Sequence, residues 1–194
     1  MPQFDLRGIK CAKYVNTAGS ISYTNPQAVG DAMTANLEMR YAEGRLYAES
    51  TLAEFMKKAT GGTISLGVKY IKDAAQQLLF GSTSKSRTIT VGTTEVSVSG
   101  LVLGAKSSPV YVGIAFYAPD MIDGVEKYTC VFVRKALFGP PAMSMQTAGE
   151  SIQFSTPTTS GEFLADDSTN QDMLEVAICD TEAAAIAWCS AVLA

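Results

Sequence analysis

Acidic residues are the main candidates for chemistry in this chain, and they are densest in residues 166–172, DDSTNQD. Four oxygen-bearing residues alternate there as in a calcium-binding loop: Asp166, Ser168, Asn170 and Asp172. However, Gln171 occupies the glycine position of such a loop, and Ala177 the position of its bidentate glutamate. Asp166 and Asp167 resemble an acid–base pair, but adjacent carboxylates in a polar loop are usually solvated. We therefore expect neither a calcium site nor a catalytic pair.

Other catalytic and ligand-binding patterns are also missing from the sequence. The chain has no histidine, which excludes Ser–His and Cys–His nucleophiles and histidine metal ligands. None of its four cysteines, Cys11, Cys130, Cys179 and Cys189, is spaced as CxxC, so buried thiols in a reducing compartment are expected. GLVLGAKSS at residues 100–108 lacks the glycine spacing of a phosphate loop. These observations predict a protein that is not an enzyme and has no metal or cofactor.

Charge is distributed unevenly along the chain. Residues 1–135 contain all 15 Lys and Arg with 11 acids, whereas residues 136–194 contain eight acids and no base. Such asymmetry indicates complementary faces that meet between subunits, or one surface kept negative. A solvated acidic loop and helix would produce the same pattern.

Alternating apolar and polar residues predict a mainly β fold. The expected strands are residues 8–15, 32–44, 63–71, 95–99, 110–117, 124–135, 151–155, 162–164 and 175–179. Residues 82–108 are expected to form a hairpin or a loop. Asp123-Gly124 predicts a tight turn between an antiparallel pair of strands, the second of which is apolar on both faces and therefore central. We expect one domain over residues 1–194, an antiparallel β-sandwich or barrel.

Two helices should accompany this sheet. The first, in KDAAQQLLFG, is expected to be capped by Asp73 and to end at Gly81 in the left-handed conformation. The second follows Asp180 or Thr181, either of which can cap it. Its apolar side should consist of Ala185, Trp188, Cys189 and Val192.

A long, charged excursion, the arm (residues 43–62), precedes the strand expected at residues 63–71. Connections in compact domains are usually about 4–6 residues long, so one of this length tends to be functional or disordered. Its apolar residues recur at helical spacing: Leu52, Phe55, Met56 and Ala59. This face either folds back on its own sheet or reaches a neighbouring subunit.

Two blocks of sequence resemble a known family. The first is RLYAESTLAEFMKKATGGTISLGVKYI (residues 45–71), followed by LLFG at the end of the expected helix. The second is VYVGIAFYAPDMIDGVEKYTCVFVRKALFGPPAMSMQTAGESIQFSTPTTSGEF (residues 110–163). Together they resemble the major tail proteins, or tail tube proteins, of long-tailed, non-contractile bacteriophages. The family often has Tyr-Ala-Asp-Asp where this chain has Tyr-Ala-Glu-Ser, and the resemblance does not extend to residues 82–100 or beyond residue 180.

The resemblance implies a structural virion protein with a phage tail tube-like fold. Six copies would form a ring whose inner strands close into one barrel, and rings would stack into a hollow tube that delivers DNA. Implied partners are other copies of the chain and the tape measure, tail tip or initiator, and tail terminator proteins. DNA would pass without specific binding. The implied location is the virion tail, assembled in the host bacterial cytoplasm, with no membrane involvement.

Two groups of residues are expected to take part in assembly. The arm should contribute interface residues: Arg45, Tyr47, Leu52, Phe55, Met56, Lys57 and Lys58. Asp166, Asp167 and Asp172 are candidates for an acidic lumen or interface, because contacts between lysine and phosphate would slow the passage of DNA. A monomeric ligand-binding β-barrel is the alternative; it requires a concave apolar pocket. A carboxylate-dependent enzyme would instead rely on Asp166 or Asp167.

Overall fold

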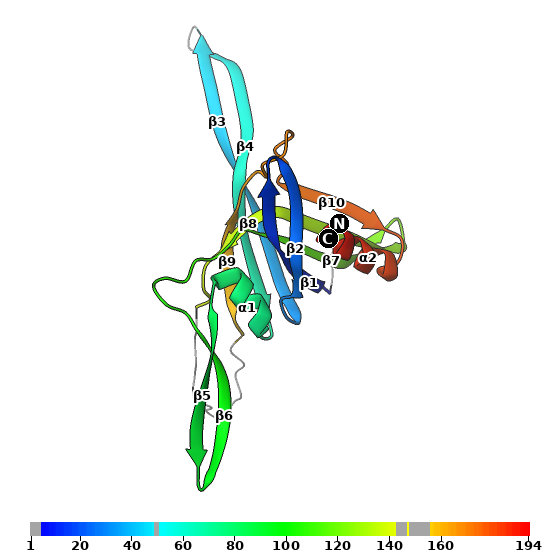
Figure 1. Ribbon diagram of the computed structural model, residues 1–194. Coiled ribbons are helices and arrows are strands. Elements are labelled where there is room, and N and C mark those ends of the chain that lie inside the picture. Colours follow the sequence, from blue (N-terminus) through cyan, green and yellow to red (C-terminus); the bar gives the residue numbers. More distant parts are fainter. Residues whose placement is uncertain (1–4, 49–50, 143–146, 148–155) are drawn as a thin grey trace.

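Ten strands and two helices form a mainly antiparallel β structure in the computed structural model, which describes residues 5–48, 51–142, 147 and 156–194 (Figure 1). The strands are β1 (Arg7–Thr17), β2 (Ser20–Ala28), β3 (Ala32–Ala48), β4 (Thr51–Val68), β5 (Thr83–Val91), β6 (Thr94–Val102), β7 (Val112–Ile122), β8 (Val125–Phe138), β9 (Thr158–Phe163) and β10 (Leu174–Cys179). The helices are α1 (Asp73–Phe80) and α2 (Glu182–Ala191). The predicted fold class is confirmed, whereas the strand expected at residues 151–155 lies outside the described residues.

Eight strands form one curled sheet in the order β2-β1-β7-β8-β9-β4-β3, with β10 paired to β8. The sheet curls so far that β3 contacts β1. β7 occupies one edge of β8, while β10 and β9 share the other, so β8 is central as predicted. Asp123 and Gly124 connect β7 to β8 with φ values of 52° and 77°, as a tight hairpin turn requires.

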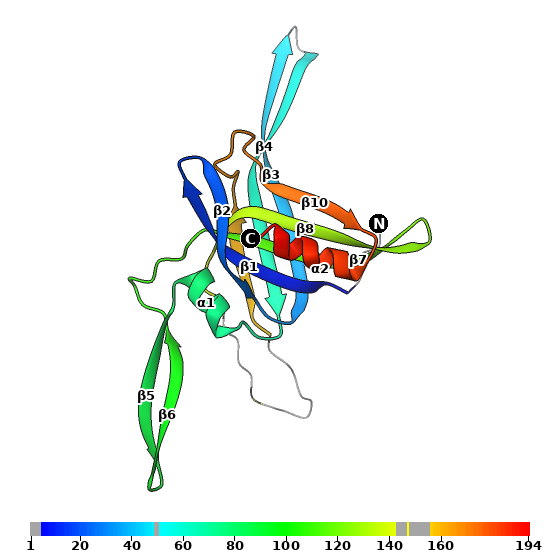
Figure 2. The same ribbon diagram turned by 45° about the vertical axis from the view of Figure 1, so that its right-hand side comes forward.

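Two hydrophobic cores lie on opposite faces of the sheet. The first lies inside the curl and is closed by α1; its large members include Ile64, Leu66, Ile114, Phe138 and Phe163. The second lies between the outer face and α2 (Figure 2); its members include Tyr23, Phe132, Ala185, Cys189 and Leu193. β8 contributes Val133 to the first core and Phe132 to the second, which explains why both of its faces are apolar.

The two helix starts differ in how they are capped. Thr181 caps α2 by accepting a hydrogen bond from the backbone N–H of Ala184 at 3.2 Å, so one of the two predicted caps is confirmed. The prediction that Asp73 caps α1 is wrong, because Lys72 occupies the cap position and its side chain makes no capping bond. Asp73 lies in the first turn, where its carboxylate opposes the positive end of the helix dipole. Gly81 adopts the predicted left-handed conformation, with φ of 66°.

The arm is not a helical excursion; it is the outer part of a hairpin formed by β3 and β4. These strands pair from Ala32 opposite Val68 as far as Ala48 opposite Thr51, through three register shifts. The prediction of a helical apolar face is therefore wrong: Phe55 and Met56 are neighbours in a strand and point to opposite faces. Pairing across the hairpin satisfies the inward-facing N–H and C=O groups of both strands and leaves the outward-facing ones to solvent, so the extended form continues beyond the core.

The inner half of β4 agrees better with its expected pattern. Ile64, Leu66 and Val68 are buried as predicted, but Tyr70 lies beyond the end of the strand and is 48% exposed. Residues 82–108 contain the β5–β6 hairpin, the first of the two forms that the sequence left open. The β5–β6 hairpin and the arm project from the sheet toward opposite ends of the molecule (Figures 1 and 2).

The cysteines behave as small apolar residues. Cys11, Cys130 and Cys189 are buried and Cys179 is half-buried, all as free thiols. Burial raises the pKa of Cys11 to about 12 and that of Cys189 to about 11, which disfavours the reactive thiolate.

Neither helix in the described part of the chain is long and apolar enough to span a membrane.

Candidate assembly interface

One face of the arm is satisfied by its own side chains. The register places Arg45 opposite Phe55 and Glu43 opposite Lys57, so these four residues share a face. The Arg45 guanidinium carbon lies 5.5 Å from the centre of the Phe55 ring, and Lys57 Nζ lies 4.4 Å from that of Tyr41. The Glu43 carboxylate lies 3.1 Å from Lys57 Nζ and 3.8 Å from a terminal nitrogen of the Arg45 guanidinium. Each contact is weak at an exposed site, but together they order this face.

The other face of the arm carries apolar side chains that are left open. Leu46 and Met56 lie on it, 58% and 73% exposed, with Lys58 two residues beyond Met56 on the same strand. Leu46 and Met56 border a shallow hollow of about 250 Å³, which is also lined by Gly44, Arg45 and Glu54. An exposed apolar group on a projecting hairpin is typical of a surface that a partner covers.

The structure thus separates the arm residues that the sequence grouped together. Arg45, Phe55 and Lys57 lie on the satisfied face, and Met56 and Lys58 on the open face. Tyr47 is 60% exposed, and its strand partner is Leu52, whose side chain lies outside the described residues. Sequence reasoning missed Leu46, Glu43 and Tyr41. The signal for them was the alternation of residues 41–47, which continues the strand expected at residues 32–44.

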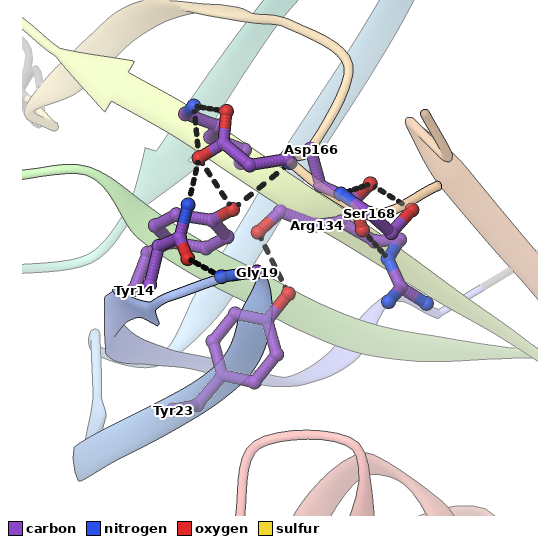
Figure 3. A network of polar contacts seen from close by, with 9 residues as sticks. Tyr14, Gly19, Tyr23, Arg134, Asp166 and Ser168 are labelled. Atoms are coloured by element: carbon purple, nitrogen blue, oxygen red, sulfur yellow. Dashed lines mark hydrogen bonds and ion pairs between the residues drawn. The ribbon is translucent and has the colours of Figure 1, made fainter. Parts of the chain in front are cut away.

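Asp166 is a buried carboxylate, so the expectation of a solvated one is wrong. It is 3% exposed and accepts a hydrogen bond from Arg134 Nε at 2.5 Å (Figure 3). Its other oxygen accepts the backbone N–H and the hydroxyl of Ser168. Burial alone raises the pKa of Asp166, but the hydrogen bonds from Ser168 and Arg134 outweigh it and hold the pKa below its usual value.

Asp167 extends the same network to β1. Its carboxylate accepts hydrogen bonds from Lys135 Nζ at 2.8 Å, Tyr14 Oη at 2.9 Å and Asn16 Nδ2 at 3.1 Å. These bonds, led by that from Lys135, lower the pKa of Asp167. Below them, the Tyr23 hydroxyl donates to the Arg134 carbonyl oxygen (Figure 3). The two carboxylates therefore fasten the loop between β9 and β10 to β1 and β8.

The acids of the last third of the chain pair with bases of the first two thirds. The pairs are Glu162–Arg40, Asp166–Arg134, Asp167–Lys135, Glu175–Arg134, Asp180–Lys127 and Glu182–Arg7. Asp172 adds its backbone carbonyl, which accepts the N–H of Asp166. The charge asymmetry of the sequence is thus largely balanced within one chain. A lumen or interface position for Asp166, Asp167 and Asp172 stays a prediction.

This pairing predicts that the protein loses stability in acid. Hydrogen bonds from Arg7 and Tyr117 lower the pKa of Glu182, as the contacts above lower those of Asp166 and Asp167. A lowered folded-state pKa adds stability above the ordinary carboxyl range, about pH 4, which is lost as the pH falls through the folded value. Urea midpoints should therefore change little from about pH 7 to about pH 5 and fall below about pH 4.

The double variant Asp167→Asn/Glu182→Gln serves as the control for this pH series. It removes two of the titrating carboxylates, so its urea midpoint should be lower at neutral pH and decline less steeply in acid. If the urea midpoint of the unaltered protein stays constant or rises on acidification, these carboxylates do not stabilise the fold through lowered pKa values.

Sequence comparison does not extend the resemblance to the tail proteins. No protein-family model matches this chain, and no curated protein matches it. The fold, the arm and the family-like blocks at residues 45–71 and 110–163 are therefore the basis for inferring its function.

Proposed function

We propose that this protein is the tail tube subunit of a long-tailed bacteriophage, which assembles with its own copies into stacked rings around a DNA channel. The observation that carries the proposal is the arm, a hairpin that leaves the core and exposes Leu46 and Met56 on its open face. A two-stranded hairpin is only marginally stable in water, so an arm of this length gains from contact with a neighbour. An arm that docks on a different surface of the neighbouring copy makes a head-to-tail contact, which repeats from copy to copy and can build a tube.

The fold and the motifs support the same proposal. A mainly antiparallel sheet with a flanking helix is the architecture that the family resemblance implies, and both family-like blocks lie largely in this sheet. β2 and β3 are the two ends of the strand order. Free edges of this kind can pair with the sheets of neighbouring copies, as closure of a ring into one barrel requires.

The proposal includes the partners that a tail tube needs. Tape measure, tail tip and tail terminator proteins would contact the lumen and the two ends of the tube, and the site of action is the virion tail. DNA would pass through without specific binding, because a channel that bound phosphate tightly would slow it.

Negative-stain electron microscopy over a range of concentrations tests this function. The unaltered protein should form rings or hollow tubes, by itself or when a tail-tip complex is added. Leu46→Ser/Met56→Ser should remain a small particle, because it removes the open apolar face of the arm and leaves the ion pairs of the other face intact. Ile186→Ser, at an exposed apolar residue of α2, is the matched control and should assemble normally.

Circular dichroism should show the same strand content for all three proteins. Tubes formed equally well by the arm variant would remove the arm from the assembly mechanism. A small particle under every condition, with the tail-tip complex present, would contradict the tail tube function.

A further inference from the structure

The β5–β6 hairpin is a second projecting element, and its side chains are almost entirely exposed. Every residue of β5 is exposed, and in β6 only Leu101 is half-buried. The hairpin extends from the body beside α1, away from both cores (Figures 1 and 2). Two strands alone are marginally stable in water, so this element also gains from a partner.

The two faces of this hairpin differ sharply in chemistry. Strand register places β-branched apolar residues on one face, between 41% and 61% exposed: Ile89, Val91, Val96, Val98 and Val102. The opposite face carries hydroxyl side chains: Ser84, Ser86, Thr88, Thr90, Ser97 and Ser99. Period-two alternation of this kind is typical of a strand pair with one face covered and one in water.

Positive charge lies on the apolar face. Lys85 and Arg87 share this face, where they precede Ile89 and Val91 along β5, and they line a hollow of about 350 Å³ with Ile89, Val98 and Val102. Within the described residues, neither cation takes part in an ion pair. A contact between two such faces would bury these cations without an acidic partner, because no acid lies on this face, and that is unfavourable. The partner surface should therefore be apolar and acidic.

The same chain carries an apolar and acidic surface where β8 pairs with β10, next to the C-terminal end of β7. Val176 and Ile178 of β10 are 56% and 55% exposed, and they pair with Val131 and Thr129 of β8. A hollow of about 280 Å³ adjoins these strand partners, lined by Val131, Thr129, residues 33–36 of β3 and Asp5, whose carboxylate also accepts a hydrogen bond from Arg7 Nε at 2.8 Å. This surface therefore combines exposed aliphatic side chains with a concave floor.

An incompletely bonded carboxylate lies beside this hollow. Asp120 of β7 is fully buried, and one of its oxygens accepts the Thr129 hydroxyl at 3.2 Å. The other oxygen has no hydrogen-bond partner within the described structure. A buried carboxylate with an open oxygen is costly and is stabilised by a cation brought near it.

We propose that the apolar face of the β5–β6 hairpin docks on this surface of a second copy of the chain, with Lys85 and Arg87 placed toward Asp5 and Asp120. The contact is head-to-tail, because the hairpin of one copy meets the sheet of the next. It rests on the proposed self-assembly and adds to it a second interface, separate from the arm. Apolar burial supplies the affinity, and the charges fix the partner and its orientation.

Site-directed cross-linking tests this contact. Val98→Cys and Val176→Cys are made as separate proteins in a Cys179→Ser background, mixed at a concentration that supports assembly, and oxidised with copper phenanthroline. We expect a heterodimer in the mixture and a ladder of multimers when one chain carries both cysteines. Val98→Cys mixed with Ile186→Cys is the matched control and should not cross-link. Adding Lys85→Glu and Arg87→Glu to the Val98→Cys protein should abolish the heterodimer.

The outcomes separate this inference from the proposed function. Homodimers of Val98→Cys would show a hairpin-to-hairpin contact and overturn the inference. Tubes that form without the heterodimer would overturn it too, while leaving the tail tube function in place. The heterodimer in a protein that never forms rings or tubes would support the docking contact and contradict the tail tube function.

Discussion

Asp166→Asn is expected to destabilise the protein by about 3 kcal/mol, because it removes the closest counter-charge of Arg134 from a buried ion pair. Arg134 is 22% exposed at its side chain, and Asp166 is its closest acidic partner; Glu175 lies farther away, at 3.6 Å. An asparagine keeps the size of the side chain but supplies one acceptor oxygen where Asp166 uses two. Urea unfolding followed by the fluorescence of Trp188, the one tryptophan, measures the change.

The neighbouring variant Asp167→Asn is the matched control. Its side chain is 41% exposed in its ion pair with Lys135, so solvent screens the interaction and the loss of stability should be much smaller. Similar losses in the two variants would show that the carboxylate of Asp166 is not buried with Arg134. Both proteins should be compared below the concentration at which assembly begins.

Gly62→Val should also be severely destabilising, by about 3 kcal/mol, because there is no room for a side chain at the base of the arm. A Cβ atom on Gly62 would lie 2.3 Å from the backbone oxygen of Glu38 and 2.3 Å from the ring of Phe163. Phe163 is fully buried and pairs with Gly62 in the β4–β9 register. The substitution must therefore displace a core phenylalanine or separate β3 from β4. Urea unfolding measures this loss as well.

Gly44→Val provides the comparison within the same hairpin. Apart from Gly44 and the two residues next to it, no atom lies within 4 Å of the position that a Cβ would take there, so a side chain points into open space. This variant should unfold at nearly the same urea concentration as the unaltered protein. Equal destabilisation by the two substitutions would mean that the hairpin, not the packing of Phe163 on Gly62, is responsible.

Gly62 also explains how the arm is aimed. β4 continues from the core residues Ile64 and Leu66 into the arm, through the register shift opposite Arg40 and Tyr41. Phe163 lies against the strand where it leaves the core. The arm is therefore a direct extension of a core strand, which fixes the direction in which Leu46 and Met56 are presented to a partner.

The arm and Asp166 show where sequence reasoning failed. Helical spacing of Leu52, Phe55 and Met56 suggested an apolar helix face, but the paired strand β3 decides the conformation, and that pairing is not local. The burial of Asp166 depends on Arg134, 32 positions earlier in the chain. The polar composition of residues 166–172 does not indicate that the Arg134 side chain packs against Asp166 in the folded protein.

Features that depend only on neighbouring residues could be predicted from the sequence. Alternation predicted the β class and the inner half of β4, and Asp123-Gly124 predicted the turn between β7 and β8. The start of α2 was predicted at Asp180 or Thr181, and Thr181 is the cap. These signals are local, because a strand face, a turn and a helix cap each involve only a few consecutive residues.

The three-dimensional fold, rather than local sequence, sets which surfaces are satisfied and which are open. The fold pairs the acids of the last third of the chain with distant bases. It divides the arm into a satisfied face and an open face, and it leaves the apolar face of the β5–β6 hairpin uncovered. Those outcomes depend on strand register and on contacts between residues far apart in sequence. A shift of one residue in register would reverse every face, which is why composition and spacing alone did not reveal them.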